Sequence, residues 1–377
     1  MSVNIRTTPV GGGLEDFLNV VEPIYRSDPN YVRPLDMDLK RRLDPKNPFF
    51  EHAEGTIFTA YKGGRCVGRS TVQIDRAHLE RHQDGAGFFG FFDTVEDEEV
   101  AKALLDAGAE WLKRRGMKRM RGPISLSLHE ELGCLVEGFD MPPMMLMPHH
   151  RPYQGGLIEK AGFSKIKDAY AWRYSVGEVP PRAQKAHDEI AGLPEVRVRT
   201  VDMKNFEADV NTILDVFNDA WEDNWGFVPA TPSEAKRLAD ELKLIVYPEL
   251  AYIAEVDGEA AAVALALPNL NELIRDCDGK LFPTGLPKLL WRLKVVGAKT
   301  ARLMILGIRK KFRSQRKYAG LSTHLYVKLN QAGQRSGIQW GELSWTLEDN
   351  APVNVAIKFM GGKIYKRYRV YEKELAG

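Results

Sequence analysis

The chain has 377 residues, and at roughly 150 residues per domain this length predicts two or three domains that each bury a core. Apolar residues make up 44% and charged residues 28%, which excludes a disordered, collagen-like or coiled-coil protein. The net charge of +2 does not commit the protein to a nucleic-acid partner.

The first half of the chain is predicted to contain strands and helices in a definite order. A strand (residues 4–8) and a helical stretch (14–25) are followed by a hairpin (56–74) that turns at two glycines. A strand GFFGFFD (87–93), a helix and a fifth strand GPISLSL (122–128) come next. The end of a helix and closing strands occupy residues 157–176.

The second half repeats this plan after a shift of about 195 residues. A connector with a short helix (177–194) precedes a strand (196–201), a helix (206–221), a hairpin (251–267) and a strand (302–308). Residues 356–375 match residues 157–176. We therefore expect an α+β protein with two similar domains, 1–176 and 195–377, each with a mixed, mostly antiparallel sheet.

Three cysteines and the apolar runs bear on location. Cys66, Cys134 and Cys277 are too far apart for a metal knuckle and disfavour a disulfide framework, so we expect buried thiols and no metal. The chain start lacks a signal-peptide pattern, and the longest apolar run (260–267) is too short to span a bilayer. These features predict a cytoplasmic protein that is still able to contact a membrane surface.

One segment departs from the neutral average. Residues 279–340 contain no Asp or Glu but fourteen Lys and Arg, so the rest of the chain carries −12. This pattern favours a local site for anions such as phosphates over a solvated basic face, which normally includes interspersed acids.

The order of elements resembles the acyl-CoA N-acyltransferase fold of the GNAT superfamily, present twice. In that fold the fourth strand leads to an Arg/Gln-x-x-Gly-x-Gly/Ala loop, and the free amides of the next helix hold the CoA pyrophosphate. In the second half Lys317, Gly320 and Ser322 occupy these positions. The resemblance also implies an oxyanion-binding backbone amide on the fourth strand and further CoA contacts after it. The corresponding residues here are Leu306, Gly307 and Ile308, then Arg316, Leu321, Thr323 and Asn350.

The first half lacks this loop. Acidic residues follow its fourth strand: Asp93, Glu96, Asp97, Glu98 and Glu99. Carboxylates stabilise a helix N-terminus but repel a pyrophosphate. We expect one acyl-CoA per chain, bound by residues 195–377, with residues 1–176 holding the acceptor or supporting the site.

The tyrosine that the superfamily often uses to protonate the thiolate is replaced by Ile158 and Ile357. The candidates for acid and base work are therefore His150, Glu131, Tyr153, His129 and Glu342. An isolated His or Tyr near a helix start often packs or caps instead. Glu342 either acts on the amine through water or pairs with the basic segment.

Two segments suggest an apolar substrate. Residues 133–150 carry Met141, Met144, Met145 and Met147, and flexible thioethers suit an adaptable apolar surface. This loop either accommodates an alkyl chain or plugs the space between the halves. Residues 286–303 form a basic amphipathic pattern with Trp291, which is typical of a helix in an anionic membrane interface or of one docked on the sheet.

The segments FFGFFD, EGFDMPP, ELSWTLEDN and GGKIYKRYRVYEKEL together resemble a group of bacterial GNAT-like proteins that includes the bacterial ceramide synthases. The resemblance implies transfer of a fatty acyl chain from acyl-CoA to the amine of a sphingoid base or its 3-keto precursor. The basic amphipathic segment 286–303 favours peripheral contact with anionic lipid on the inner face of the cytoplasmic membrane. The alternatives are a GNAT acetyltransferase for a small amine and a non-catalytic anionic lipid-binding protein. We expect no nucleic-acid partner, because the basic segment lacks interleaved aromatic residues.

Overall fold

The computed structural model describes residues 2–375, which form two compact units. Unit 1 contains the residues up to Ala169, Ile274–Gly285 and the residues from Lys366 onward, whereas unit 2 contains Tyr170–Leu273 and Leu286–Tyr365. Each unit therefore includes part of the closing strand of the other sequence half. The boundaries at residues 176 and 195, drawn from the repeat, stay a prediction.

Unit 1 is built on the sheet order β1-β2-β3-β4-β5-β15, with β8 paired to β15. Strands β4 and β5 are parallel, whereas β1 and β2, β2 and β3, β3 and β4, and β5 and β15 pair in the antiparallel direction. The elements are β1 (Asn4–Pro9), α1 (Glu15–Asn19), α2 (Val21–Tyr25), α3 (Asp36–Arg42), the 3₁₀ turn Pro48–Glu51, β2 (Ala53–Lys62), β3 (Arg65–Asp75), α4 (Arg76–His82), β4 (Ala86–Thr94), α5 (Glu98–Lys113), β5 (Arg119–Gly122), β6 (Ile124–Ser125), β7 (Glu131–Leu132), β8 (Cys134–Glu137), α6 (Gln154–Lys160) and the first part of β9 (Ser164–Ser175).

Unit 2 has the sheet order β9-β14-β13-β12-β11-β10, in which β13 and β14 are parallel. The elements are the second part of β9, α7 (Pro181–Ala191), β10 (Val196–Thr200), α8 (Phe206–Trp221), α9 (Pro232–Ile245), the 3₁₀ turn Pro248–Leu250, β11 (Ala251–Val256), β12 (Glu259–Pro268), α10 (Leu270–Ile274), α11 (Gly285–Trp291), a π-helical turn (Arg292–Val296), β13 (Thr300–Ile308), α12 (Lys310–Arg313), the 3₁₀ turn Arg316–Tyr318, α13 (Leu321–Arg335), β14 (Trp340–Leu347) and α14 (Ala351–Phe359). Strand β15 (Lys363–Glu374) begins in unit 2 and continues from Lys366 in unit 1.

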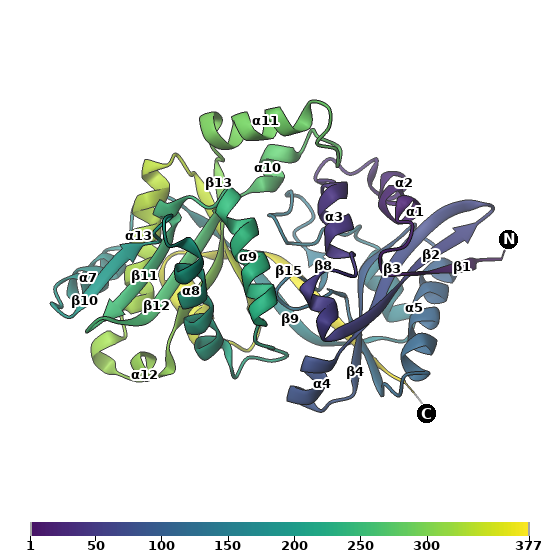
Figure 1. Ribbon diagram of the computed structural model, residues 1–377, viewed down its shortest axis with the longest axis horizontal. Coiled ribbons are helices and arrows are strands. Elements are labelled where there is room, and N and C mark those ends of the chain that lie inside the picture. Colours follow the sequence, from purple (N-terminus) through teal and green to yellow (C-terminus); the bar gives the residue numbers. More distant parts are fainter. Residues whose placement is uncertain (1, 376–377) are drawn as a thin grey trace. The chain divides into compact units, whose positions relative to one another are not determined.

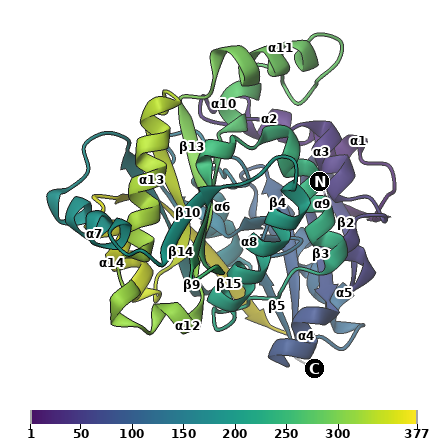
Figure 2. The same ribbon diagram turned by 60° about the vertical axis from the view of Figure 1, so that its left-hand side comes forward.

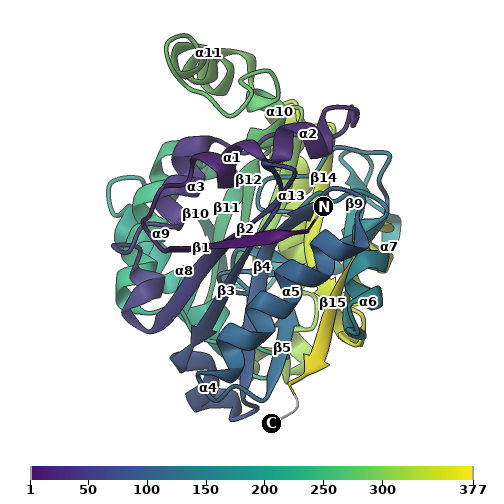
Figure 3. The same ribbon diagram turned by 90° about the vertical axis from the view of Figure 1, so that its right-hand side faces the viewer.

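Helices cover both faces of each sheet. In unit 1 the apolar stripe of α5, with Leu104 and Leu105, packs on β2 and β3 (Figure 3). In unit 2, α13 and α7 lie side by side on one face, and α8 and α9 lie on the other (Figures 1 and 2). The core under α13 includes Leu321, Leu325 and the small alanines of β12. Hydrophobic burial on both faces thus fixes the predicted α+β fold.

Three expectations about local structure are wrong. The predicted strand 122–128 is not continuous: β5 ends at Gly122, because Pro123 has no N–H for the ladder, and only Ile124–Ser125 then form a strand, β6. The predicted helix over 286–303 ends at Val296, since Gly297 adopts a φ of 72° and the chain then enters β13. Of the three free thiols only Cys134 is buried, while Cys66 and Cys277 are half-buried.

Candidate acyl-CoA site and predicted catalytic residues

Strands β13 and β14 of unit 2 separate part-way along their length. They pair from Thr300 with Trp340 to Leu303 with Leu343, and β13 then continues to Ile308 beside β12 alone. Leu306, Gly307 and Ile308, the predicted oxyanion donors, lie in this continuation. Successive residues of a strand alternate in direction, so backbone N–H groups of this stretch point in turn toward β12 and toward the opening between β13 and β14. Gly307 also lets α8 approach, because a Cβ there would lie 3.0 Å from that of Ala220.

Helix α13, which follows β13 after the short helix α12, begins without a side-chain cap. Gly320 is the N-cap of α13, and the first helical hydrogen bond runs from the amide of His324 to the Gly320 carbonyl at 2.8 Å. No acidic residue lies in the first turn, which contains Leu321, Ser322 and Thr323. The amides before His324 and the positive end of the helix dipole suit an anion.

The matching helix of unit 1, α5, is capped by its own acid. The Asp97 carboxylate accepts hydrogen bonds from the amides of Glu99 (3.0 Å) and Val100 (3.3 Å). Glu98 and Glu99 add charge to the first turn. Asp93 does not belong to this cluster, as the sequence suggested, but lies buried on β4. The α5 terminus is therefore electrostatically closed to a phosphate.

Helix α7 packs directly on the predicted CoA loop. A Cβ on Gly320 would lie 2.9 Å from Cγ1 of Ile190 and 3.2 Å from the carbonyl oxygen of Ala186, so glycine is needed here for helix packing. Lys317 forms an ion pair with Glu195 and is half-exposed. The sequence analysis missed this packing role for Gly320. Gly320 and Ile190 are 130 residues apart in the chain, and only the fold makes them neighbours.

Several charges of the basic segment are paired within unit 2. Arg309 pairs with Asp215, Lys310 with Glu222 and Asp223, and Lys311 with Glu259. Arg316 is exposed and has no ion-pair partner among residues 2–375. Part of the charge of this segment is therefore paired within unit 2, whereas Arg316 is not.

Glu342 lies in a buried ionic cluster. Its carboxylate is 3.1 Å from Nε of Arg302 and accepts a hydrogen bond from the Tyr365 hydroxyl. Arg302 also donates to Ser344 Oγ at 3.3 Å. Glu342 is fully buried, and Arg302 comes from the basic segment, so the structure contains the ion pair that was one of the two roles predicted for Glu342. The remaining predicted CoA residue, Asn350, is the N-cap residue of α14.

The predicted catalytic residues of unit 1 have local partners. His150 is buried, its Nδ1 accepts the amide of Leu135 at 3.1 Å, and burial lowers its pKa to about 4. This histidine is therefore neutral near pH 7, with its proton on Nε2. Tyr153 donates to the Thr94 carbonyl at 2.9 Å, and burial raises its pKa to about 12.

His129 lies on the turn between β6 and β7, and Glu131 is the first residue of β7. The guanidinium of Arg42 donates to Glu130 at 2.6 Å and to Glu131 at 2.7 Å, and it covers the ring of Phe91 at 4.7 Å. Arg42 is buried, so the two carboxylates compensate its charge. His129 is exposed.

Two further polar clusters lie in unit 1, and the sequence analysis did not predict the partners of their residues. Asp93 accepts from Arg69 at 2.7 Å and from the Tyr25 hydroxyl, deep in the core. His149 Nε2 lies 3.0 Å from Asp28, and its Nδ1 is buried with no hydrogen-bond partner among the described residues. Burial is the largest effect on the pKa of His149 and lowers it. Only long-range packing brings these residues together, so no local motif could have found them.

The methionine-rich loop is anchored inside unit 1. The buried Lys366 ammonium donates to the carbonyls of Gly138 (2.5 Å) and Met141 (2.7 Å). Met144 and Met147 are buried and Met141 and Met145 are half-buried. Part of this loop therefore serves as core. Within residues 2–375 no group of three or more His, Cys, Asp or Glu is placed to hold a metal ion, and no helix is long and apolar enough to cross a membrane.

Comparison with known proteins decides the family. A bacterial ceramide synthase of Caulobacter vibrioides is 41% identical to this chain over 366 residues, which covers 96% of this chain and 95% of that protein. The chain belongs to the bacterial ceramide synthase family. Protein YghO of Escherichia coli is 37% identical over 373 residues, which covers 98% of this chain and 95% of that protein. No family model matches the sequence.

Solved structures confirm the fold expected for this ceramide synthase family member. A tandem GNAT protein from the clavulanic acid biosynthesis pathway aligns over 99% of both chains with a TM-score of 0.60 and 12% identity. A GCN5-related N-acetyltransferase from Sphaerobacter thermophilus aligns over 100% of this chain and 96% of that chain, with a TM-score of 0.55 and 12% identity. The predicted tandem GNAT fold is thus confirmed, and family membership makes the chain an N-acyltransferase, for which the fold implies acyl-CoA as co-substrate.

Proposed function

We propose that this enzyme transfers a fatty acyl chain from acyl-CoA to the amine of a sphingoid base or its 3-keto precursor and so forms a ceramide. The observation that carries the proposal is the 41% identity, over nearly the whole length of both chains, to a bacterial ceramide synthase. An insertion or deletion of a domain would have shortened that alignment. The reaction forms an amide C–N bond and breaks the thioester C–S bond, and the amine proton leaves with the CoA thiol.

We propose further that unit 2 holds the CoA. The uncapped α13 terminus supports this assignment, because Leu321, Ser322 and Thr323 offer amides and the first turn carries no acid. Arg316, exposed and without an ion-pair partner among residues 2–375, adds a charge for the phosphates. The Asp97-capped α5 of unit 1 supports the complementary proposal that residues 1–176 bind the acceptor or support the site.

For this reaction the protein has to position the thioester and the amine and stabilise the oxyanion that develops. The opening between β13 and β14 would receive the pantetheine arm, and a backbone amide near Leu306–Ile308 would stabilise the developing oxyanion. His150, Glu131, Tyr153, His129 and Glu342 stay predictions for acid and base work. Among them His150 has its Nδ1 occupied by the Leu135 amide, so it is suited to donate from Nε2 rather than to accept there.

The experiment is a direct assay of the amide product. Purified enzyme is incubated with palmitoyl-CoA or acetyl-CoA and with sphinganine, 3-ketosphinganine or a small polyamine, and amides are measured by mass spectrometry. We expect palmitoyl transfer to a long-chain base to give the largest kcat/KM. A preference for acetyl-CoA and a small amine would instead establish the acetyltransferase alternative and refute the proposal.

We also propose that the segment after Leu286 contacts an anionic membrane. Helix α11 stands at the edge of unit 2 away from its sheet (Figure 2). Leu290, Trp291, Val295 and Val296 are exposed, with 57% of Trp291 and 69% of Val295 accessible. Lys288, Lys294 and Lys299 are exposed on the same short segment. Exposed apolar side chains beside cations match an interface of anionic lipid, from which a long-chain amine would be taken.

A further inference from the structure

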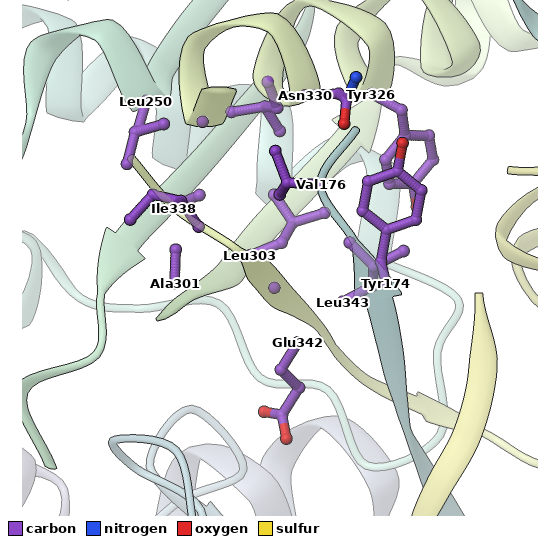
Figure 4. A pocket seen from close by; sticks show the side chains of 14 residues that line it. Tyr174, Val176, Leu250, Ala301, Leu303, Tyr326, Asn330, Ile338, Glu342 and Leu343 are labelled. Atoms are coloured by element: carbon purple, nitrogen blue, oxygen red, sulfur yellow. The ribbon is translucent and has the colours of Figure 1, made fainter. Parts of the chain in front are cut away.

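Unit 2 contains an apolar pocket between the sheet and helix α13 (Figure 4). The cavity has a volume of about 50 Å³ and opens partly to solvent. Because one water molecule needs roughly 10–15 Å³ on this measure, the space suits a few methylene groups. Helix α13 contributes Tyr326, Leu329, Asn330 and Gly333, which share one helical face. The rest of the lining is Tyr174, Val176, Leu250, Ala266, Ala301, Leu303, Ile338, Gly341, Glu342 and Leu343.

Two polar side chains of the lining, those of Asn330 and Glu342, are turned to other partners. The Asn330 amide donates to the Gly177 carbonyl at 2.8 Å and accepts the Gly177 amide at 3.0 Å. The carboxylate of Glu342 lies with Arg302 and Tyr365, and Figure 4 shows it pointing away from the apolar side chains. The Tyr174 hydroxyl is buried without a partner among the described residues. The walls therefore present hydrocarbon almost throughout, which selects an apolar ligand.

The pocket begins where β13 and β14 separate. Leu303 and Leu343 are the last paired residues of the two strands, and both line the pocket. The α13 N-terminus, where the pyrophosphate is proposed to bind, lies roughly 20 Å along the helix from Gly333, at 1.5 Å per residue. A thioester entering from the open end of the strands would therefore direct its acyl chain toward this pocket.

We propose that this pocket receives the distal methylenes of the acyl chain and limits its length. The inference rests on the proposed function, because it names the subsite for the donor of that same reaction. Two glycines set the depth of the pocket. A Cβ on Gly333 would lie 3.4 Å from Cγ1 of Val176 and 3.6 Å from Cβ of Ile338, which are ordinary contacts. A Cβ on Gly341 would meet only the Ala301 carbonyl oxygen, at 3.4 Å.

The test compares acyl-CoA donors from hexanoyl to stearoyl with sphinganine as acceptor, in the full-length enzyme. Each methylene kept out of an apolar site costs about fourfold in binding. We expect Gly333→Leu to lower the ratio of kcat/KM for stearoyl-CoA to that for hexanoyl-CoA by about tenfold or more, and Gly333→Ala to lower it by about fourfold. Activity with hexanoyl-CoA should stay near that of the wild type.

Controls separate this inference from folding and from the proposed function. Gly333→Ala adds only ordinary contacts in a helix interior and should raise Tm, so a loss confined to long chains cannot come from unfolding. Gly192→Ala, an exposed glycine of unit 2 outside the lining, should leave the chain-length profile unchanged. Tyr174→Phe should also leave it unchanged, because an alkyl chain offers the hydroxyl no partner.

Two outcomes would overturn the inference while the proposed function stands. One is long-chain transfer by Gly333→Leu with the same donor profile as the wild type. The other is a loss of more than about tenfold in long-chain transfer for Tyr174→Phe, which would assign the pocket to a polar ligand. A wild-type enzyme that acylates no long-chain base would refute the proposed function itself.

Discussion

The buried pair of Arg302 and Glu342 allows a structural role to be separated from a catalytic one. Glu342 is fully buried and Arg302 is 1% exposed, so Glu342→Leu leaves a guanidinium without this carboxylate in the interior. Removing one member of a buried ion pair costs about 3–5 kcal/mol. A domain of 150–250 residues loses roughly 2–4 °C of Tm per kcal/mol, so we expect a fall of about 6–20 °C.

The double variant Arg302→Met with Glu342→Leu tests the reasoning. A buried pair replaced by apolar residues of similar volume is often neutral in stability. The Tyr365 hydroxyl then lacks this acceptor at a cost of about 1–3 kcal/mol, so we expect most but not all of the Tm to return. Calorimetry of the intact enzyme measures Tm, and the palmitoyl transfer assay measures kcat for the same preparations.

If Glu342 serves only the ion pair, the folded double variant loses less than about tenfold in kcat. Loss of a general base would cost about 100- to 10,000-fold instead. A single Glu342→Leu variant that melts with the wild type would refute the stability argument, and a stable but inactive double variant would restore the catalytic role.

Three further outcomes follow from the same structure. Ser322→Asp should keep or raise Tm, because an acid in the first turn of α13 suits the helix dipole, yet it should weaken acyl-CoA binding in calorimetry by about tenfold or more. Asp97→Ala, the matched change at α5, should lower the free energy of unfolding by about 1 kcal/mol and leave acyl-CoA affinity unchanged. The reverse pattern would place the nucleotide in unit 1. The pKa of His150 is lowered to about 4 in the folded state, so the unfolded chain binds this proton first as the pH falls. The contribution of this group to the free energy of unfolding is complete above about pH 6.5 and should decline by about 3 kcal/mol toward pH 4. Urea unfolding of His150→Gln should lack that decline. Replacing Trp291 and Val295 by Ser and Asp should reduce binding to phosphatidylglycerol vesicles in flotation by about tenfold or more with unchanged binding of palmitoyl-CoA, whereas equal flotation of both proteins would remove this segment as the membrane contact.

The sequence by itself determined the elements and their repetition. Alternation and glycine turns at Gly63–Gly64 and Asp257–Gly258 set both hairpins, and the apolar stripe after Gly320 set α13. The acids around Asp97 also predicted correctly that α5 is capped by carboxylate. These features depend on residues near one another in the chain, whose backbone preferences and spacing can be read directly.

Only the tertiary structure decided what each buried polar group does. Glu342 meets Arg302 across two parallel strands, Gly320 meets Ile190 of a separate helix, and Asp93, placed by the sequence at the start of α5, meets Arg69 on β3. The same holds for the pocket, whose walls come from several strands and one helix. Such partners are selected by the low dielectric and close packing of the interior, where a charge or a Cβ is tolerated only if a distant segment accommodates it.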